Sequence, residues 1–443
     1  MLECHTYRYM GHSLSDDRKA YRSPEEEEAW RKCDAPAHFR AQLLAQGVAT
    51  DEQLQEREAQ ARQRIYDATV FAGQATDPDP STIYDGLFAD TTTDELDPSY
   101  ATPESELVSP PKKRGGGGSR QILYRHAVAE GLIEEMLRDR RVIVYGEDVA
   151  DYGGAFGVTR GIFEIFGRNR IFNTAISEAA IIGTAVGAAM VGLRPVVELM
   201  YIDFVLMAMD QIGNQAAKNR YMFGGKAKIP MVIRTSVGGG RGYAGQHSQS
   251  LEAVLTMFPG LKVVAPATAY DAKGLIKAAI RDDNPVVYIE HQHALTERGE
   301  VPDEDYTVPI GVARVSREGS DCTVLAYSWL YYRALAAAEQ LAAEGLSVEV
   351  IDLRTLVPLD LATITASVAK TKHLVIVQQA PERGCFGEHV AYQVQQQVFA
   401  DLAVPITIVA AHNVPPPMAA TLEEENLPSV AKIAARIRQT VGR

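Results

Sequence analysis

The feature that most constrains the fold of this chain is a change in amino-acid composition at residues 91–119. This stretch is rich in Pro, Ser, Thr, Asp and Glu, and it then runs through Pro110-Pro111-Lys112-Lys113-Arg114 into four glycines and Ser119. Such a composition favours neither a helix nor a strand, so it predicts a flexible linker. The chain of 443 residues therefore divides into a segment of residues 1–90, the linker, and a larger region that begins at residue 120.

Residues 1–90 predict a short strand, a loop and helices, with the strand at residues 2–9. Ser23-Pro24-Glu25-Glu26 and Thr50-Asp51-Glu52-Gln53 are typical helix starts, each with an N-cap hydroxyl and a Glu or Gln three residues later. Residues 1–118 hold 22 acidic and 13 basic side chains, so −9 of the net charge of −13 lies there. This asymmetry indicates that the chain is a composite.

From about residue 120, helical patterns alternate with β-rich runs. The first five runs lie at residues 142–145, 195–199, 231–234, 263–265 and 286–290. Their spacing predicts an α/β fold with a largely parallel sheet. A second group of runs predicts a smaller, separate α/β domain. It comprises strands at residues 322–327, 347–352, 373–378 and 406–409, with helices at residues 332–344 and 388–399.

Composition argues against several classes of partner and site. A net charge of −13 makes nucleic acid or an anionic membrane surface an unfavourable partner. No apolar run is long enough to span a bilayer, and the first twenty residues are polar and charged rather than signal-like. The four cysteines lie far apart with no CxxC pair, which argues against a disulfide framework or a zinc site and favours a reducing cytoplasm.

Five motifs of the larger region could carry chemistry. They are Gly146-Glu147-Asp148-Val149, Ile176-Ser177-Glu178-Ala179-Ala180, residues 198–204, the glycine-rich residues 238–245 followed by Gln246-His247-Ser248-Gln249, and residues 279–285. Each motif also has a purely structural interpretation. Glu178 could simply favour a helix N-terminus, and His247 could be a hydrogen-bonded loop histidine. Met200 and Phe204 could be core residues, and the glycines could be ordinary turns.

The order and spacing of these motifs resemble one family. Residues 120–443 resemble the β subunit of the pyruvate and branched-chain 2-oxo-acid dehydrogenases. The motifs that carry the resemblance are I-S-E at residues 176–178, Q-H-S-Q at 246–249, A-I-R-D-x-N-P at 279–285 and D-L-R-T-L-x-P-L-D at 352–360. The resemblance implies a transketolase-like pyrimidine-binding domain at residues 120–308, a transketolase C-terminal domain at residues 309–443, and thiamine diphosphate as cofactor.

The same resemblance assigns roles to single residues. Glu178 matches the glutamate that hydrogen-bonds N1′ of the cofactor's aminopyrimidine and promotes its imino tautomer. Glu147 is expected close to Glu178, where two carboxylates share a proton more readily than both ionise. Met200 and Phe204 are expected to flank the pyrimidine. His247 is expected to reach towards the reactive carbon C2, as a donor to the substrate carboxylate or as an acid or base.

The motif at residues 279–285 matches a potassium site of the family. The implied ligands are Asp282 and Asn284, together with the carbonyl groups of Met231, Ala279 and Ile280. A ligand set made only of oxygen atoms suits a hard monovalent ion. The resemblance therefore predicts a structural K⁺ ion.

Two departures from the family pattern leave the substrate open. Thr296 stands where the family has an aromatic residue, after Glu290-His291-Gln292-His293-Ala294-Leu295. Arg241 and Tyr243 near His247 are polar and bulky for a pocket that holds a branched aliphatic chain. These changes leave the cofactor chemistry alone and concern the choice of substrate.

The first segment resembles a different subunit of the same family. Residues 6–16 match the T-Y-R-x-x-G-H-S-x-S-D loop of the α subunit, and the likeness runs to about Asp90. In the family this loop closes over the active site. His12 matches the histidine that reaches the cofactor diphosphate, and Ser13 matches a serine that some members phosphorylate. The α-type G-D-G motif with its downstream Asn, which holds Mg²⁺ and the diphosphate, does not occur in this sequence. We therefore expect a partner chain to supply it.

The resemblance implies one part of a heteromeric enzyme. We expect a thiamine diphosphate-dependent 2-oxo-acid dehydrogenase that decarboxylates its substrate and passes the acyl group to a lipoyl arm, built as a heterotetramer with two copies of each chain. Two alternatives stay open. The enzyme could instead transfer a two-carbon ketol unit from a ketose to a lipoyl or acyl-carrier domain, or the chain could be a non-catalytic partner subunit. Release of carbon dioxide separates the first two, and intact Glu178 and His247 count against the last.

Overall fold

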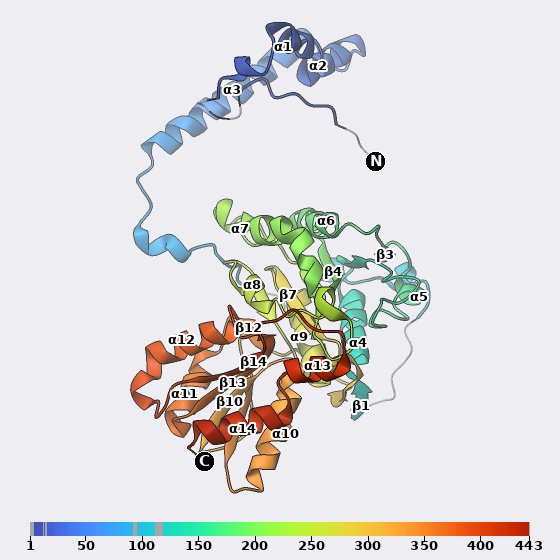
Figure 1. Cartoon of the computed structure of the whole chain (residues 1–443). Coiled ribbons are helices and arrows are strands. Elements are labelled where there is room, and N and C mark those ends of the chain that lie inside the picture. The colour runs from blue at the N-terminus through green and yellow to red at the C-terminus, as the bar shows by residue number, and fades with distance from the viewer. Residues whose placement is uncertain (1–3, 12, 14–15, 92–94, 111–117, 443) are drawn as a thin grey trace. The chain divides into compact units, whose positions relative to one another are not determined.

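The computed structural model describes residues 4–11, 13, 16–91, 95–110 and 118–442 (Figure 1). The chain forms two compact units, Met1–Ile83 and Tyr84–Arg443. Every apolar side chain that is buried among the described residues belongs to the second unit. The two units therefore rest on different stabilising interactions.

The first unit is helical. Its helices are α1 (Pro24–Arg31), α2 (Ala35–Ala45) and α3 (Asp51–Gln74). The predicted helix starts are confirmed, because the Ser23 hydroxyl accepts from the Glu26 N–H at 3.1 Å and Thr50 and Gln53 form a reciprocal capping box. No residue of these helices is buried. Local capping, rather than a core, therefore defines where they begin.

The strand predicted at residues 2–9 is not formed over the described residues 4–9. Instead Tyr7 stacks on Trp30 with 5.1 Å between ring centroids, and the Tyr9 hydroxyl donates to Asp34 at 3.0 Å. A strand needs a second strand to satisfy its backbone groups, and the described residues of this unit contain none. The prediction of a strand is therefore wrong for the chain on its own.

Residues 95–110 pack along the second unit. They contain the short 3-10 turns η3 (Pro98–Tyr100) and η4 (Glu104–Glu106). The Arg141 guanidinium lies 3.7 Å from the Tyr100 ring centroid, and the Thr102 hydroxyl donates to the Met136 carbonyl at 2.8 Å. The Val108 N–H donates to the Ile165 carbonyl at 2.8 Å. These contacts correct the expectation of a flexible linker for this stretch, whereas residues 111–117 lie outside the described residues.

A seven-stranded sheet forms the first layer of the second unit. In spatial order its strands are β12 (Thr355–Val357), β6 (Lys262–Val264), β7 (Val286–His291), β5 (Val232–Val237), β4 (Arg194–Tyr201), β2 (Val142–Gly146) and β3 (Ile171–Asn173). All neighbouring strands pair in parallel except β12 with β6. Five of these strands coincide with the five predicted runs, so the prediction of a largely parallel sheet is confirmed.

Helices and a small ribbon cover this sheet. The helices are α4 (Tyr124–Arg138), α5 (Phe163–Phe166), α6 (Glu178–Met190), α7 (Asn219–Met222), α8 (Glu252–Thr256) and α9 (Ala269–Arg281). Helices α4 and α9 pack against each other. A two-stranded antiparallel ribbon joins β1 (Ser119–Leu123) to β8 (Arg298–Pro302). The α6 end and the β1 end lie at opposite sides of this layer (Figure 1).

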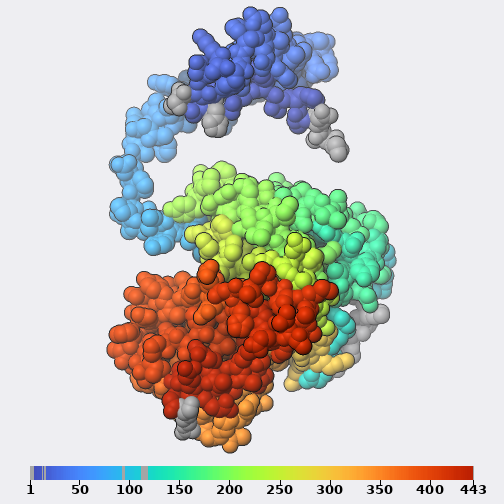
Figure 2. All heavy atoms as spheres, viewed as in Figure 1, coloured from blue at the N-terminus to red at the C-terminus, as the bar shows by residue number. Residues whose placement is uncertain are grey.

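A five-stranded sheet forms the second layer and confirms the α/β fold predicted for this part of the chain, although the layer is not separate from the first. Its spatial order is β14 (Thr407–Ala411), β13 (Leu374–Pro381), β10 (Cys322–Ala326), β11 (Val348–Asp352) and β9 (Arg314–Arg317), of which only β9 is antiparallel. Its helices are α10 (Leu330–Ala342), α11 (Leu361–Thr371), α12 (Phe386–Val398), α13 (Ala420–Asn426) and α14 (Val430–Thr440). In Figure 2 the orange and red atoms of this layer meet the green and yellow atoms of the first along a broad front.

One motif joins the two layers. Strand β12 belongs to the D-L-R-T-L-x-P-L-D motif of the second layer, yet it pairs with β6 of the first. Arg354 of the same motif forms an ion pair at 2.6 Å with the fully buried Asp271 of α9. The largest apolar cluster also contains side chains from both layers, among them Ile233, Leu325 and Phe386. The largest apolar cluster of the second unit therefore continues across the two layers, so the two layers are packed together rather than loosely joined.

Candidate cofactor site and active site

Two carboxylates begin the candidate site. Glu178 is the first residue of α6, and Glu147 follows the end of β2. Burial is the main cause that raises the pKa of the Glu147 carboxyl, and the Glu178 carboxylate is the next. The structure therefore brings the two predicted residues into electrostatic contact. Within the described part of the chain neither carboxylate has a hydrogen bond or an ion pair, so both remain available to a ligand.

The end of β4 forms one wall of the site. Met200 lies near the end of β4, and Phe204 lies in the 3-10 turn η5 (Ile202–Ala208) that follows. Both side chains are half-buried. A register shift between Leu199 and Tyr201 interrupts the pairing of β4 with β5 at this point. The turn η5 packs against α6, the helix that begins with Glu178. A local irregularity at the end of β4 thus precedes the turn that packs against α6.

His247 lies against the same wall. It follows the 3-10 turn η7 (Ala244–Gln246), and its ring is 5.3 Å from the Phe204 ring and 4.9 Å from the Tyr201 ring. Both contacts are edge-to-face. Gln249 donates to Asp203 of η5 at 2.7 Å, which ties the histidine-bearing stretch to the wall. The structure therefore unites Phe204 and His247, and it adds Tyr201, which the sequence did not predict as a site residue.

A buried ionic network that the sequence did not predict lies in the strands beside the site. Arg234 of β5 donates to Glu198 of β4 at 2.7 Å and to Glu290 of β7 at 2.8 Å. All three side chains are buried, and burial raises the pKa of the Glu290 carboxyl. Glu198 also contributes to the raised pKa of Glu147. A charged residue inside each of three apolar strand runs was the available signal for this network.

The motif at residues 290–296, which departs from the family pattern at Thr296, helps to pack the two layers together. The rings of His291 and His293 stack on Trp329 of the second layer, with centroids 5.3 Å and 4.4 Å away. His291 also hydrogen-bonds Gln379 at 2.6 Å. Burial lowers the pKa of His291 to about 3, so the ring is neutral at physiological pH.

The side chains predicted to bind potassium are already paired within the chain. The Asp282 carboxylate forms an ion pair with the Lys262 ammonium at 2.6 Å. The Asn284 amide accepts from the Ala89 N–H at 2.6 Å and donates to the Ala89 carbonyl at 3.0 Å. These two side chains therefore do not fit a cation in this arrangement. Among the described residues, no group of three or more His, Cys, Asp or Glu side chains could hold a metal ion.

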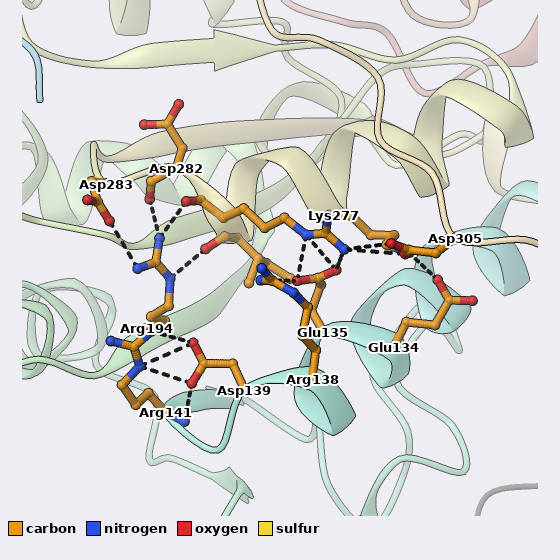
Figure 3. Close-up of polar contacts among 12 residues, drawn as sticks. Glu134, Glu135, Arg138, Asp139, Arg141, Arg194, Lys277, Asp282, Asp283 and Asp305 are labelled. Atoms are coloured by element: carbon orange, nitrogen blue, oxygen red, sulfur yellow. Dashed lines mark hydrogen bonds and ion pairs between the residues drawn. The ribbon is translucent and has the colours of Figure 1, made fainter. Parts of the chain in front are cut away.

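The predicted backbone ligands are less committed. Arg194 donates to the carbonyl oxygens of Ile280 and Asp282 at 2.7 Å and 2.9 Å (Figure 3). The Met231 carbonyl accepts one backbone hydrogen bond from β7. Ala279 lies in the last turn of α9 beside them. A carbonyl oxygen has two lone pairs, so the Met231 carbonyl can accept an ion in addition to its one donor, whereas the Arg194 guanidinium already places a positive charge at the Ile280 carbonyl.

One predicted site residue cannot be placed. His12 lies outside the described residues, and Ser13 beside it is exposed. In the part of the chain that the structure describes, no helix has both the length and the apolar character needed to cross a membrane.

Three family models match the chain. The model for the transketolase pyrimidine binding domain matches residues 120–297, and the model for the transketolase C-terminal domain matches residues 311–433. The model for the dehydrogenase E1 component matches residues 1–81. The resemblance of the two parts of the chain to two different subunits is therefore confirmed.

Curated relatives cover the second part of the chain. The β subunit of acetoin:2,6-dichlorophenolindophenol oxidoreductase from Cupriavidus necator is 45% identical over 333 residues, which are 73% of this chain and 98% of the relative. The β subunit of the pyruvate dehydrogenase E1 component from Rhizobium meliloti is 43% identical and covers 76% of this chain and 73% of the relative. The β subunit of 2-oxoisovalerate dehydrogenase from Bacillus subtilis is 43% identical and covers 71% and 97%.

A solved structure has a similar fold. It is described as a split gene transketolase, inactive beta4 tetramer, and it has a TM-score of 0.60 and 23% sequence identity. The match covers 72% of this chain and 98% of that chain, and it concerns the fold alone. With these relatives and family models in place, the chain belongs to the β-subunit family of the thiamine diphosphate-dependent 2-oxo-acid dehydrogenases, and it carries an E1 α-type segment before the β-type part.

Proposed function

We propose that this chain forms the pyrimidine side of the active site in a heteromeric enzyme that decarboxylates a 2-oxo acid and passes the acyl group to a lipoyl arm. The observation that carries the proposal is the pair of half-buried carboxylates, Glu147 and Glu178, which lack protein partners in the described chain. The Phe204 and His247 rings contact each other, and the turn η5 that carries Phe204 packs against α6, the helix that begins with Glu178. Two half-buried carboxylates without a paired cation are typical of a site that a ligand completes.

Thiamine diphosphate supplies the electron sink for loss of carbon dioxide when it is bound. Glu178 is the first residue of α6. It would hold a proton at N1′ of the pyrimidine. Glu147, with its raised pKa, would share that proton, because two adjacent carboxylates resist simultaneous ionisation.

His247 and the wall residues would act on the other side of the reacting centre. Met200 and Phe204 would flank the pyrimidine with apolar surface. The His247 ring is held edge-on by Tyr201 and Phe204, which leaves its nitrogen atoms to donate to the substrate carboxylate or to exchange a proton. His12, from the E1-type segment, would reach the diphosphate. These roles also argue against a non-catalytic subunit.

Two ions belong to the proposal. Mg²⁺ would be held mainly by a partner chain with the G-D-G motif and its Asn, which this sequence lacks. A diphosphate without a metal would leave its negative charge poorly neutralised. K⁺ would be structural and would depend on the backbone carbonyls of Met231, Ala279 and Ile280 rather than on the paired side chains of Asp282 and Asn284.

Exposed apolar side chains support an α-type partner chain. Among the apolar side chains of the second unit that are more than half exposed, six lie on α6, η5 and α7 or directly beside these elements: Ile176, Val191, Leu206, Met207, Met222 and Phe223. Solvent-exposed apolar surface of this extent marks an interaction site. We propose a heterotetramer with two copies of each chain. The four unpaired cysteines, two of them exposed, suit a reducing cytoplasm.

A second candidate substrate class has support from one relative. The 45% identical protein from Cupriavidus necator is named for the oxidation of acetoin, a hydroxyketone. Cleavage of a hydroxyketone, or of a ketose with transfer of a two-carbon unit to a lipoyl or acyl-carrier domain, would use the same cofactor without loss of carbon dioxide. The exposed Tyr243 and Arg241 near His247 suit a polar donor.

One substitution tests the role of Glu178. Glu178→Gln keeps the side-chain volume but cannot hold the proton at N1′. In the enzyme assembled with its partner chain, exchange of the cofactor's C2 proton should fall by several orders of magnitude, while the melting temperature of the second unit stays unchanged. Glu164→Gln, in the short helix α5 of the same layer, is a matched control. Near-normal exchange in Glu178→Gln would refute the assignment.

Product analysis separates the substrate classes. The assembled enzyme is given one substrate at a time, with a lipoyl domain as acceptor. The substrates are pyruvate, a branched-chain 2-oxo acid, acetoin and a ketose. Acyl-lipoyl product with stoichiometric carbon dioxide supports the 2-oxo-acid reaction. Acyl or ketol transfer without carbon dioxide supports the second candidate and excludes the first.

A further inference from the structure

The loop that carries His247 has an unusual backbone. We call residues 238–247 the glycine loop. Gly238, Gly240, Gly242 and Ala244 have positive φ angles of 113°, 97°, 72° and 60°. Alternation of such residues turns successive N–H groups to one concave side, where they favour an anion. The glycine loop ends at His247, so its path sets the position of the imidazole.

A carboxylate from the second layer occupies that concave side. Glu423 of α13 accepts from the Gly240 N–H at 2.6 Å and from the Gly242 N–H at 3.0 Å, one through each oxygen. Its side chain is only 5% exposed. Hydrogen bonds from backbone N–H groups to a buried carboxylate are stronger than neutral ones and fix direction as well as distance.

Helix α13 itself is held by two further contacts. The Asn426 amide oxygen accepts from the His412 N–H at 3.1 Å. Glu424, the neighbour of Glu423, pairs with Arg333 of α10 at 3.2 Å. Glu423 therefore reaches the glycine loop from a helix that is fixed within the second layer.

The opposite side of the glycine loop is closed by rings. A Cβ atom at Gly238 would lie 2.4 Å from Nε2 of His291, and one at Gly240 would lie 2.3 Å from Nε2 of His293. Both imidazoles stack on Trp329. The glycine loop thus contacts the two imidazoles through Gly238 and Gly240 and is hydrogen-bonded by Glu423 through Gly240 and Gly242.

We propose that Glu423 is a positioning residue for His247. Its carboxylate fills the anion site of the glycine loop and thereby transmits the placement of the second layer to the active-site imidazole. The inference rests on the proposed function of His247 and goes beyond it, because it gives the C-terminal domain a direct part in the reaction geometry. In this role Glu423 acts through the glycine loop.

The first test replaces the carboxylate and keeps its shape. Glu423→Gln accepts from one glycine N–H but turns its amide N–H₂ against the other. In the assembled enzyme we expect kcat for acyl transfer to fall roughly 10-fold to 100-fold, since small misplacement of a reacting group costs that much. The Kd for thiamine diphosphate should not change. Glu425→Gln is the matched control, because Glu425 lies on the same helix and is 68% exposed.

The second test restores the anion. Glu423→Ala removes a group of the size of acetate, and a pocket of about 360 Å³ lined by Glu423, Leu427 and Ser248 gives access to the vacated space. Acetate should therefore restore kcat of Glu423→Ala, whereas acetamide and chloride should not. A purely structural role for Glu423 would give no such anion-specific recovery. The proposal would be overturned if acetate restored neither kcat nor the slow exchange of the Gly240 and Gly242 amide hydrogens in Glu423→Ala.

Hydrogen exchange separates this inference from the proposed function. Exchange of the Gly240 and Gly242 amide hydrogens is measured on the chain itself and needs no turnover. We expect faster exchange in Glu423→Gln than in the parent, and slowing by acetate in Glu423→Ala. Unchanged exchange in both variants would overturn the role of Glu423 even in an active enzyme. A parent enzyme without activity towards any 2-oxo acid would instead overturn the proposed function.

Discussion

Helices α3 and α9 show how differently the two units of this chain are stabilised. Helix α9 has 13 residues, and eleven of them are buried, including Lys273 and Lys277. Helix α3 has 24 residues, and none is buried. Instead α3 exposes Ile65 and Phe71, at 70% and 77%. A helix with a good cap but no buried face gains little stability from packing, so we expect the first unit to be much less stable than the second.

The same difference separates two ionic triads. In the first unit, Arg40 pairs with Asp51 at 2.5 Å and with Glu58 at 2.7 Å, and these side chains are 29–59% exposed. In the second unit, Arg234 and its two carboxylate partners are 1–5% exposed. The geometry is similar, but water screens only the first triad. The comparison predicts unequal consequences when the arginine is removed.

Removal of the buried arginine should have the largest effect. Arg234→Ala leaves Glu198 and Glu290 buried without a cation, so we expect the free energy of unfolding of the second unit to fall by about 3–5 kcal/mol. Arg40→Ala should lower the stability of the first unit by less than about 1 kcal/mol, because its carboxylates are solvated.

The chain contains two tryptophans, one in each unit, which allows both effects to be measured. Urea unfolding is followed by the fluorescence of Trp329 in a Trp30→Phe background, and by that of Trp30 in a Trp329→Phe background. Equal losses for the two arginine variants would show that burial does not distinguish the units.

The pH dependence of stability should differ between the units. Glu252 of α8 is buried, one of its oxygens lacks a partner among the described residues, and burial raises its pKa to about 7 from 4.5. A raised pKa in the folded state gives stability that is fully present below the unfolded pKa and is lost as pH rises through the folded pKa. We therefore expect the parent to lose up to about 1.4 kcal/mol per pH unit relative to Glu252→Gln within that window.

Chemical denaturation of the second unit at a series of pH values tests this prediction. Glu52→Gln, on the exposed surface of α3, is the control and should leave the pH curve of the second unit unchanged. A parent and a Glu252→Gln variant with parallel curves between pH 4.5 and 7 would contradict the assigned pKa.

Potassium should stabilise only the second unit. If the carbonyls at the end of α9 bind K⁺, replacement of potassium by tetramethylammonium should cost ~1.4 kcal/mol when the ion is at about ten times its Kd. The salt exchange is cleaner than Asp282→Ala, because that variant also loses the ion pair with Lys262. Identical melting curves in the two salts would show that K⁺ does not stabilise the second unit.

The smallest effect on the chain alone is expected at an exposed residue of the first unit. Phe71→Ser should change the stability of the free chain by less than about 0.5 kcal/mol, because the ring is 77% exposed. Leu132→Ala in α4, fully buried, should cost about 2–5 kcal/mol and is the matched core variant. Hydrogen exchange of α3 measured with the partner chain should show that Phe71→Ser weakens assembly. Unaltered assembly would mean that this face has no partner.

Much of the fold was predictable from the sequence because its signals are local. The hydroxyls of Ser23 and Thr50 mark helix starts within four residues, and five apolar runs mark strands of the first sheet. Motifs of a few residues also identified the family and singled out Glu178 and His247. The prediction of a strand at residues 2–9 was wrong because a strand needs a partner strand, and local sequence does not say whether one is present.

Contacts across long stretches of the sequence were decided only by the tertiary structure. Gly240 and Glu423 are 183 residues apart, and Ala89 and Asn284 are 195 residues apart. Strand β12 leaves its own layer to pair with β6, although its residues lie in a motif that the sequence identified.

The sequence by itself therefore determined the local elements, the family and the identity of the candidate catalytic groups. The tertiary structure decided which polar groups are free and which are paired: Glu147 and Glu178 stay available, whereas Asp282 and Asn284 are engaged. The physical reason is that local propensity acts between neighbours in the chain. Burial, ion pairing and hydrogen bonding depend instead on which distant residues the packed core brings together.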